Sequence, residues 1–284
     1  MTLGISWFQN LKIRKKSSQP FFAHNNSILP EFLKKQLSPQ IFSTLEIFYS
    51  FHIQLENITW QKNINVMSIL TQWESLAVNP QEDPFFKEIV LSANQHQISP
   101  SLPVLMIRGR KKDWIKKKWD RFSDLVHTSS TTVGPFIEIT MHLLGYPAPK
   151  LVEQAKVLAV ALELTIRLKK IPLYHQSEKM IFAQEDMGLF RYDEKNYQGK
   201  KVNENLRRLV MHHTDKIRNL YEESSSLLNK IPTNTGGALT VLYHQGNTWL
   251  ENIKNNWENI FDNNPPLEKR DLWPLMLQQA PYHL

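Results

Sequence analysis

The chain has 284 residues, of which 41% are apolar, and its formal net charge is +7. It contains no cysteine, which excludes disulfide scaffolds, cysteine zinc sites, iron–sulfur clusters and thiol catalysis. No apolar run reaches the roughly 18 residues of a membrane-spanning helix, because Glu163 interrupts the longest stretch, from 157 to 166.

The amino-terminal segment is basic. Residues 1–28 contain Lys12, Arg14, Lys15 and Lys16, together with several serines, and the first acid is Glu31. This composition resembles a mitochondrial transit peptide, and a basic tail on a bacterial cytoplasmic protein is the alternative. We therefore expect residues 1–28 to be a separate segment and residues 29–284 to form a single domain.

From residue 31 onward the pattern is helical, with apolar residues three and four positions apart and few strand signals. Asp83 precedes one of these segments as a suitable amino-terminal cap, and Pro39 lies where a helix start tolerates proline. We expect the breakers 145–149 and 232–237 to separate the later helices. The pattern predicts an all-α bundle with helices at 41–55, 66–77, 84–93, 121–144, 150–171, 202–230 and 238–260.

A dense basic run occupies residues 108–121, where we expect a further helix with aromatic residues among its lysines. In one interpretation the tryptophans face the core and the lysines are solvated. In the other, the run contacts anionic lipid or a protein partner. A basic run without a recognisable reader module does not predict nucleic-acid binding. The candidate surface residues are Arg108, Arg110, Lys111, Lys112, Trp114, Lys116, Lys117, Lys118 and Trp119.

The common catalytic motifs are missing: the chain has no G-x-S-x-G, H-E-x-x-H, Walker or G-x-G-x-x-G sequence. His212 and His213 are adjacent on a predicted helix, so they project in different directions and do not jointly bind one metal ion from that helix. We expect a packed or exposed histidine pair there. The residues by themselves therefore predict no catalytic group, metal or cofactor.

The order of several segments resembles the squalene/phytoene synthase family over most of residues 29–262. The residues that carry the resemblance are Phe48–Asn57, Trp73, Asp83-Pro84, Phe122–Leu125, Leu144-Gly145 and Ala161–Thr165. The resemblance implies an all-α bundle of the isoprenoid-synthase type. The helical pattern of the sequence predicts the same all-α class without this resemblance.

Active members of that family are similar in two aspartate-rich motifs whose carboxylates hold Mg²⁺ against the diphosphates of prenyl substrates. The first motif, Asp-Asp-x-x-Asp, falls on Glu56, Asn57 and Trp60 in this chain. The second, Asp-x-x-Glu-Asp, falls on Lys170, Leu173 and Tyr174. Because one carboxylate remains and a lysine stands where a metal ligand is expected, we predict no metal, no cofactor and no catalysis.

Within the family, the chain is more similar to the divergent branch that resembles mitochondrial complex I assembly factor 6. Leu168–Phe182, Leu125–Gly145 and Leu272–Leu277 carry this similarity. It implies a role in assembling respiratory complex I on the matrix side of the inner membrane, with a complex I subunit or another assembly factor as partner. Two alternatives stay open: an active prenyl-diphosphate synthase with rearranged ligands, Glu56 and Glu163, and a peripheral lipid-binding protein.

Overall fold

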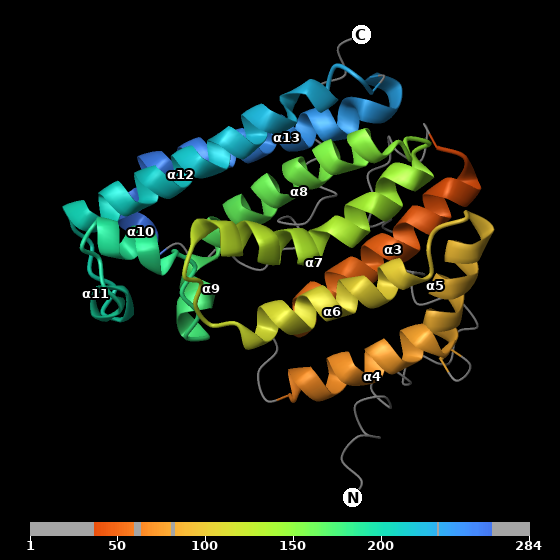
Figure 1. The fold of residues 1–284 in the computed structure, drawn as a ribbon, viewed down its shortest axis with the longest axis horizontal. Coiled ribbons are helices and arrows are strands. Elements are labelled where there is room, and N and C mark those ends of the chain that lie inside the picture. The colour runs from red at the N-terminus through yellow and green to blue at the C-terminus, as the bar shows by residue number, and fades with distance from the viewer. Residues whose placement is uncertain (1–36, 60–63, 81–82, 232, 263–284) are drawn as a thin grey trace, which may run out of the picture.

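The computed structural model describes residues 37–59, 64–80, 83–231 and 233–262 (Figure 1). The described residues form helices and no strand, which confirms the predicted all-α class. No helix within these ranges combines the length and hydrophobicity needed to cross a bilayer. The predicted segment 1–28 and the stretch Leu272–Leu277 lie outside the described residues. The helices are α3 (Pro39–Ile58), α4 (Val66–Val78), α5 (Pro84–Gln95), α6 (Ser101–Ile115), α7 (Phe122–Leu143), α8 (Pro149–Lys169), α9 (Ile171–Gln176), α10 (Gln184–Leu189), α11 (Glu194–Gln198), α12 (Glu204–Ser224) and α13 (Thr233–Asn255).

Two helix starts follow directly from local sequence. The Asp83 carboxylate accepts hydrogen bonds from the backbone N–H groups of Phe85 (2.8 Å) and Phe86 (3.2 Å), which confirms the predicted cap of α5. Pro39 begins α3, and the hydroxyl of Ser38 accepts a hydrogen bond from the Ile41 N–H at 3.3 Å. Both starts need no tertiary contact, so the sequence alone predicts them.

Three expectations need correction. Gly236 and Gly237 do not end a helix but lie inside α13, which begins at Thr233 and packs against α8 and α12. That packing offsets the low helix propensity of glycine, about 1 kcal/mol per residue. The helix expected over 108–121 ends at Ile115, and Trp119 turns into the core from a non-helical segment. Finally, the short helices α9, α10 and α11 were not expected, because five or six residues carry no readable periodicity.

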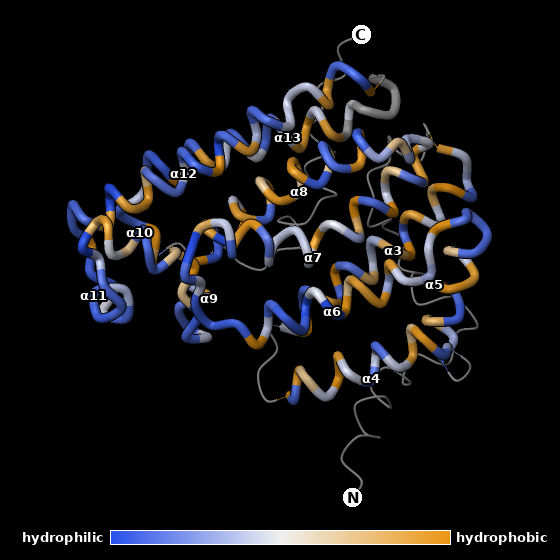
Figure 2. Tube along the Cα trace, in the orientation of Figure 1, coloured by the Kyte–Doolittle hydropathy of each residue, from blue (hydrophilic) through white to orange (hydrophobic). Residues whose placement is uncertain are grey.

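The helices enclose two hydrophobic cores that share α7. One core is built mainly from α3, α4, α5 and α6, and the other from α8 through α13. Helix α7 contributes Phe136 and Ile139 to the first core and Val133 and Ile137 to the second. In Figure 1 the long helices run side by side with α7 among them, and Figure 2 shows α11 and α12 as largely hydrophilic helices. Side chains on opposite faces of α7 are therefore packed into different cores, and this helix lies at the centre of the molecule.

Helices α6 and α7 approach closely at Gly109. A β-carbon at this position would lie 2.0 Å from the Thr131 carbonyl oxygen, so only glycine fits. Proline has no backbone N–H, so Pro135 inside α7 cannot donate the helical hydrogen bond that the Thr131 carbonyl would otherwise accept. The missing side chain of Gly109 lets α6 pack directly against this part of α7.

We predict that Gly109→Ala lowers the free energy of unfolding by about 3 kcal/mol, because a backbone carbonyl cannot move aside as a flexible side chain would. Denaturant unfolding measures the change. The control is Gly188→Ala in α10, where an added β-carbon has no neighbour within 4 Å. This control is expected to stay within about 1 kcal/mol of the parent. Equal destabilisation by both substitutions would contradict the close packing of α6 on α7.

Candidate functional site

A cluster of charged side chains is buried where α3, α6, α8 and α9 meet. It contains Glu56 on α3, Arg110 and Asp113 on α6, and a larger group from the end of α8 and the segment that follows it. The exposed fraction of every member is 7% or less. A charge removed from water is stable only when it is paired, so these residues are constrained to contact one another. The cluster consists of Glu56, Arg110, Asp113, Glu163, Arg167, Lys170 and Lys179.

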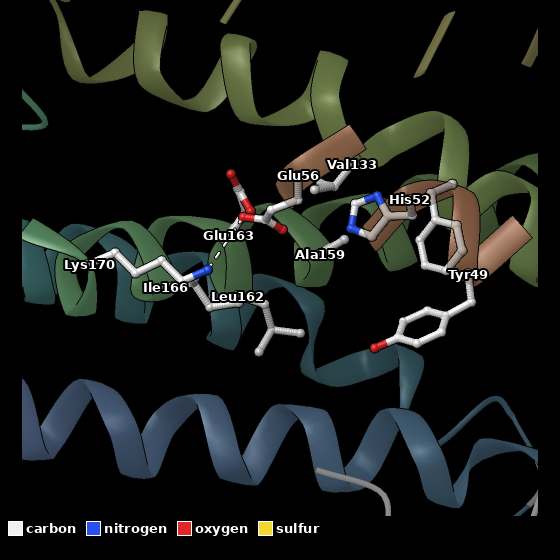
Figure 3. A pocket seen from close by; sticks show the side chains of 10 residues that line it. Tyr49, His52, Glu56, Val133, Ala159, Leu162, Glu163, Ile166 and Lys170 are labelled. Atoms are coloured by element: carbon white, nitrogen blue, oxygen red, sulfur yellow. Dashed lines mark hydrogen bonds and ion pairs between the residues drawn. The ribbon is translucent and has the colours of Figure 1, made fainter. Parts of the chain in front are cut away.

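Lys170 and Glu56 form the ion pair that joins α8 to α3. The Lys170 Nζ lies 3.5 Å from the Glu56 Oε1, and 2% and 7% of the two residues are exposed. Figure 3 shows the ammonium group pointing toward the carboxylates of Glu56 and Glu163. Burial alone would raise the pKa of Glu56, but Lys170 and then Arg110 lower it from 4.5 to about 2. Glu56 is therefore an anion that an internal cation neutralises.

A second set of ion pairs is centred on Asp113 and Arg167. The Arg167 Nη1 lies 2.9 Å from the Asp113 Oδ1, and the Arg167 Nε donates to the Glu163 Oε1 at 3.0 Å. Arg110 Nη1 and Lys179 Nζ each lie 3.8 Å from the Asp113 Oδ2. Burial opposes the charged state of Arg167, yet Asp113 raises its pKa well above the ordinary value. These contacts connect α6 to α8.

The cluster has an excess of positive charge. Four cations (Arg110, Arg167, Lys170 and Lys179) face three carboxylates (Glu56, Asp113 and Glu163), which leaves one net positive charge. Burial lowers the pKa of Lys179 to about 8, although Asp113 opposes this shift. The Lys179 ammonium donates to the Asp113 carbonyl at 2.7 Å and lies 5.3 Å from the Trp114 ring centre. An environment of this sign opposes the entry of a divalent cation.

A small cavity beside the Glu56–Lys170 pair lies between the two cores (Figure 3). Its volume is about 20 Å³, which is room for about one water molecule. The polar lining residues are Tyr49, His52, Glu56, Glu163 and Lys170. Burial lowers the pKa of His52 to about 4, so this imidazole is neutral at pH 7. Apolar side chains from α7 and α8 fill the remaining walls.

The structure brings together some of the residues predicted from the two motifs and leaves others apart. Glu56 and Lys170 are in contact, and the buried Tyr174 ring lies 5.9 Å from the Arg167 guanidinium. Asn57 is exposed and Leu173 is half-buried, so neither joins the charged cluster. Trp60 lies outside the described residues. Neither motif includes Asp113, Arg167 or Lys179, so these members of the cluster were not predicted.

Two members of the predicted surface run are buried, which corrects that expectation. Arg110 is 3% exposed and belongs to the charged cluster. Trp119 is fully buried, donates from its Nε1 to the Thr128 hydroxyl at 3.1 Å, and lies under Arg167. The half-buried Trp114 ring is covered by Lys117 and Lys179. Arg108, Lys112 and Lys117 remain exposed.

The adjacent histidines both contact the carboxylate of Asp186. His212 Nε2 lies 3.1 Å from one oxygen of Asp186, and His213 Nε2 lies 3.0 Å from the other. Lys216 Nζ is 2.7 Å from the first oxygen. This contact attaches α10 to α12; His213 is buried and His212 is half-buried, which agrees with the expected packed or exposed pair.

The donor set around the motif positions does not fit magnesium. Mg²⁺ requires several oxygen ligands in octahedral geometry. The motif positions that the structure describes supply the carboxylate of Glu56, which Lys170 already pairs. Among the described residues, no group of three or more acidic or histidine side chains is arranged to hold a metal ion.

The fold is that of the isoprenoid-synthase class, and comparison with known proteins identifies the family. The squalene/phytoene synthase family model matches residues 47–271. The chain belongs to the squalene/phytoene synthase family. No curated protein sequence matches it.

Solved structures share this fold at low sequence identity. A dehydrosqualene synthase in complex with a ligand has a TM-score of 0.72 and 20% identity, with 95% of this chain and 94% of that chain covered. The squalene synthase HpnC from Alicyclobacillus acidocaldarius has a TM-score of 0.70 and 14% identity, with 79% and 87% covered. YisP from Bacillus subtilis has a TM-score of 0.60 and 14% identity, with 84% and 86% covered.

We predict that the Glu56–Lys170 pair makes stability depend on pH. The pKa of Glu56 is lowered in the folded protein, so its contribution is complete above about pH 4.5 and is lost as the pH falls toward 2. Glu56→Gln is expected to lower the free energy of unfolding by about 3 kcal/mol at pH 7, because the substitution leaves Lys170 buried without its partner. Urea unfolding at several pH values measures the difference, which shrinks in acid.

The matched control is Glu204→Gln, which breaks the exposed ion pair between Glu204 and Arg207 at 3.2 Å. Its effect is expected to be below about 1 kcal/mol at every pH. A Glu56→Gln effect that is equally small, or that does not change with pH, would contradict the buried pair.

Proposed function

We propose that this chain is a non-catalytic member of the squalene/phytoene synthase family. The observation that carries the proposal is the Lys170–Glu56 ion pair at 3.5 Å. It places the ammonium group of one motif position against the carboxylate of the other, where, by the resemblance, active members hold Mg²⁺. A fixed cation of this kind neutralises the remaining carboxylate but cannot bridge to a diphosphate in the way that a coordinated metal does.

The dimensions and charge of the site support the same proposal. Ligand pockets for small molecules usually enclose about 300 Å³ or more, whereas the cavity here measures about 20 Å³. A prenyl chain therefore has no room beside Glu56 and Lys170 without rearrangement of α3, α7 or α8. The net positive charge of the buried cluster also disfavours a divalent cation.

The alternative of an active synthase with rearranged ligands has less support. It requires Glu56 and Glu163 to turn toward a metal ion. Lys170 pairs with Glu56, and the Arg167 Nε donates to Glu163 at 3.0 Å. A metal would have to displace both cations from these carboxylates, which would leave Lys170 buried without its partner and Arg167 paired with Asp113 alone.

For its biological role, we propose that the chain assists assembly of respiratory complex I on the matrix side of the mitochondrial inner membrane. The similarity of residues 125–145, 168–182 and 272–277 to the complex I assembly factor 6 branch supports this role. A protein that no longer turns over a prenyl substrate still offers a stable helical surface for a partner. The expected partner is a complex I subunit or another assembly factor.

We predict that the purified chain, incubated with farnesyl or geranylgeranyl diphosphate and Mg²⁺, gives no C30 or C40 product. Product extraction and chromatography measure turnover, and calorimetry with Mg²⁺ and a thio-analogue of farnesyl diphosphate measures binding. The squalene synthase from Alicyclobacillus acidocaldarius is the parallel positive control. Product formation above background would overturn the proposal that the chain is non-catalytic.

We predict that deletion of the gene causes loss of assembled complex I while isoprenoid levels stay unchanged. Native gel electrophoresis measures assembly, and lipid extraction measures isoprenoids. Complementation with the parent chain and with Lys170→Met/Glu56→Met, which removes both charges together, is expected to restore assembly. Normal complex I with missing isoprenoids would instead support the synthase alternative.

A further inference from the structure

The exposed residues of α6 form a single line along the helix. They are spaced three and four positions apart and, at about 100° per residue, fall within an arc of about 80°. Every other residue of α6 is buried or half-buried. Leu105 and Ile115 are 41% and 64% exposed, and the basic residues Arg108 and Lys112 lie between them on this line. We call this line the α6 stripe; it consists of Ser101, Leu105, Arg108, Lys112 and Ile115.

Cations continue directly beyond the stripe. Lys116 is half-buried and Lys117 and Lys118 are exposed in the segment that follows Ile115. Lys118 is neutralised by Glu194 at 2.6 Å, whereas Lys117 donates to the uncharged carbonyl of Ser177 at 3.0 Å.

Lys112 and Lys116 have no acidic partner within the part of the chain that the structure describes. Arg108 pairs with Glu74 at 2.7 Å, but no carboxylate lies within ion-pair distance of Lys112 or Lys116. The single acid inside the helix, Asp113, points inward and is buried. Ile115 is therefore an exposed aliphatic side chain between two unpaired lysines.

From this arrangement we infer that the α6 stripe and the following lysines form a contact surface for an anionic lipid bilayer. Leu105 and Ile115 lie ten residues apart, about 15 Å along the helix axis, so both can enter the interface when α6 lies flat on it. The aliphatic stems of Lys112 and Lys116 remain near the apolar layer while their ammonium groups reach the headgroups. Each lysine near an anionic surface increases partitioning about fivefold.

The chemistry of the surface favours lipid over a protein or a nucleic acid. Lysine is depleted in the cores of protein interfaces, which instead favour tryptophan, tyrosine and arginine. The aromatic rings nearby are not available for stacking on bases, since Trp119 is buried and Trp114 is covered by Lys117 and Lys179. Unpaired lysines around one aliphatic side chain match a fluid anionic layer, which requires no fixed hydrogen-bond geometry.

Vesicle co-sedimentation of the full chain tests the inference. We expect binding to phosphatidylcholine vesicles that contain phosphatidylglycerol, no binding to pure phosphatidylcholine, and weaker binding as salt screens the charges. Lys112→Gln/Lys116→Gln is expected to reduce partitioning about 25-fold. Adding Ile115→Ser to this double substitution is expected to reduce vesicle partitioning further, because it removes the aliphatic contact.

Matched controls separate the stripe from a general effect of net charge or folding. Lys150→Gln/Lys195→Gln removes the same charge from exposed positions elsewhere, and Val78→Ser removes an aliphatic side chain that is 68% exposed on α4. Both controls are expected to bind vesicles like the parent, and thermal unfolding followed by circular dichroism verifies that all variants fold.

Three outcomes would overturn the inference: equal binding to neutral and anionic vesicles, equal loss in the controls and the stripe variants, or tight binding to duplex DNA with no vesicle binding. These measurements do not involve the Glu56–Lys170 site, so their failure is distinguishable from failure of the proposed function.

Discussion

The Lys170–Glu56 ion pair is the constraint around which the centre of the molecule is organised. Two groups that are more than nine-tenths buried retain their charges only because they neutralise each other. The buried pair between Asp113 on α6 and Arg167 on α8 likewise keeps both groups charged and in contact. The relative positions of three helices are thereby fixed by charge as well as by apolar packing, because a shift of any one of them would leave an ion without its partner.

Proteins of very different sequence share this fold. The structure of this chain and that of a dehydrosqualene synthase agree with a TM-score of 0.72 at 20% identity, so the fold does not depend on one particular set of side chains. Two apolar cores, joined through α7, supply the stability that this requires. The chemistry of the centre therefore depends on the buried charged residues between these cores and not on the fold.

Features that depend on contacts within a few residues were predicted from the sequence, whereas features that depend on distant contacts were not. Helices with local signals were correct, such as α5 with its Asp83 cap, since a cap requires contacts only three residues away. Gly236 and Gly237 indicated a helix end because their propensity is local, whereas the packing of α13 on α8 and α12 that overrides it is not visible in sequence. The short helices α9 to α11 fall below the length at which periodicity is informative.

The candidate site was predictable in part. The resemblance assigned Glu56 and Lys170 to the two motifs, and the structure places them in contact across 114 positions of sequence. Arg110 was grouped with its exposed neighbours because a charge run carries no mark of which members turn inward. One signal was available: Glu163 and Arg167 are spaced four apart within the largely apolar stretch 157–168 of α8, which indicates a buried charge pair. Asp113 is the one acid between the two basic groups of the run, and a buried Arg167 gives it a partner inside the protein.

The interlocked charges also restrict how this protein can change over evolutionary time. An acid in place of Lys170 would set two carboxylates side by side in a region that excludes water, and loss of Glu56 alone would strand an ammonium group there. A single exchange that removes or reverses one of these two charges is therefore expected to lower the stability of the protein. Positions 56 and 170 are therefore coupled, and a change of charge at one of them is tolerated best when the other changes with it.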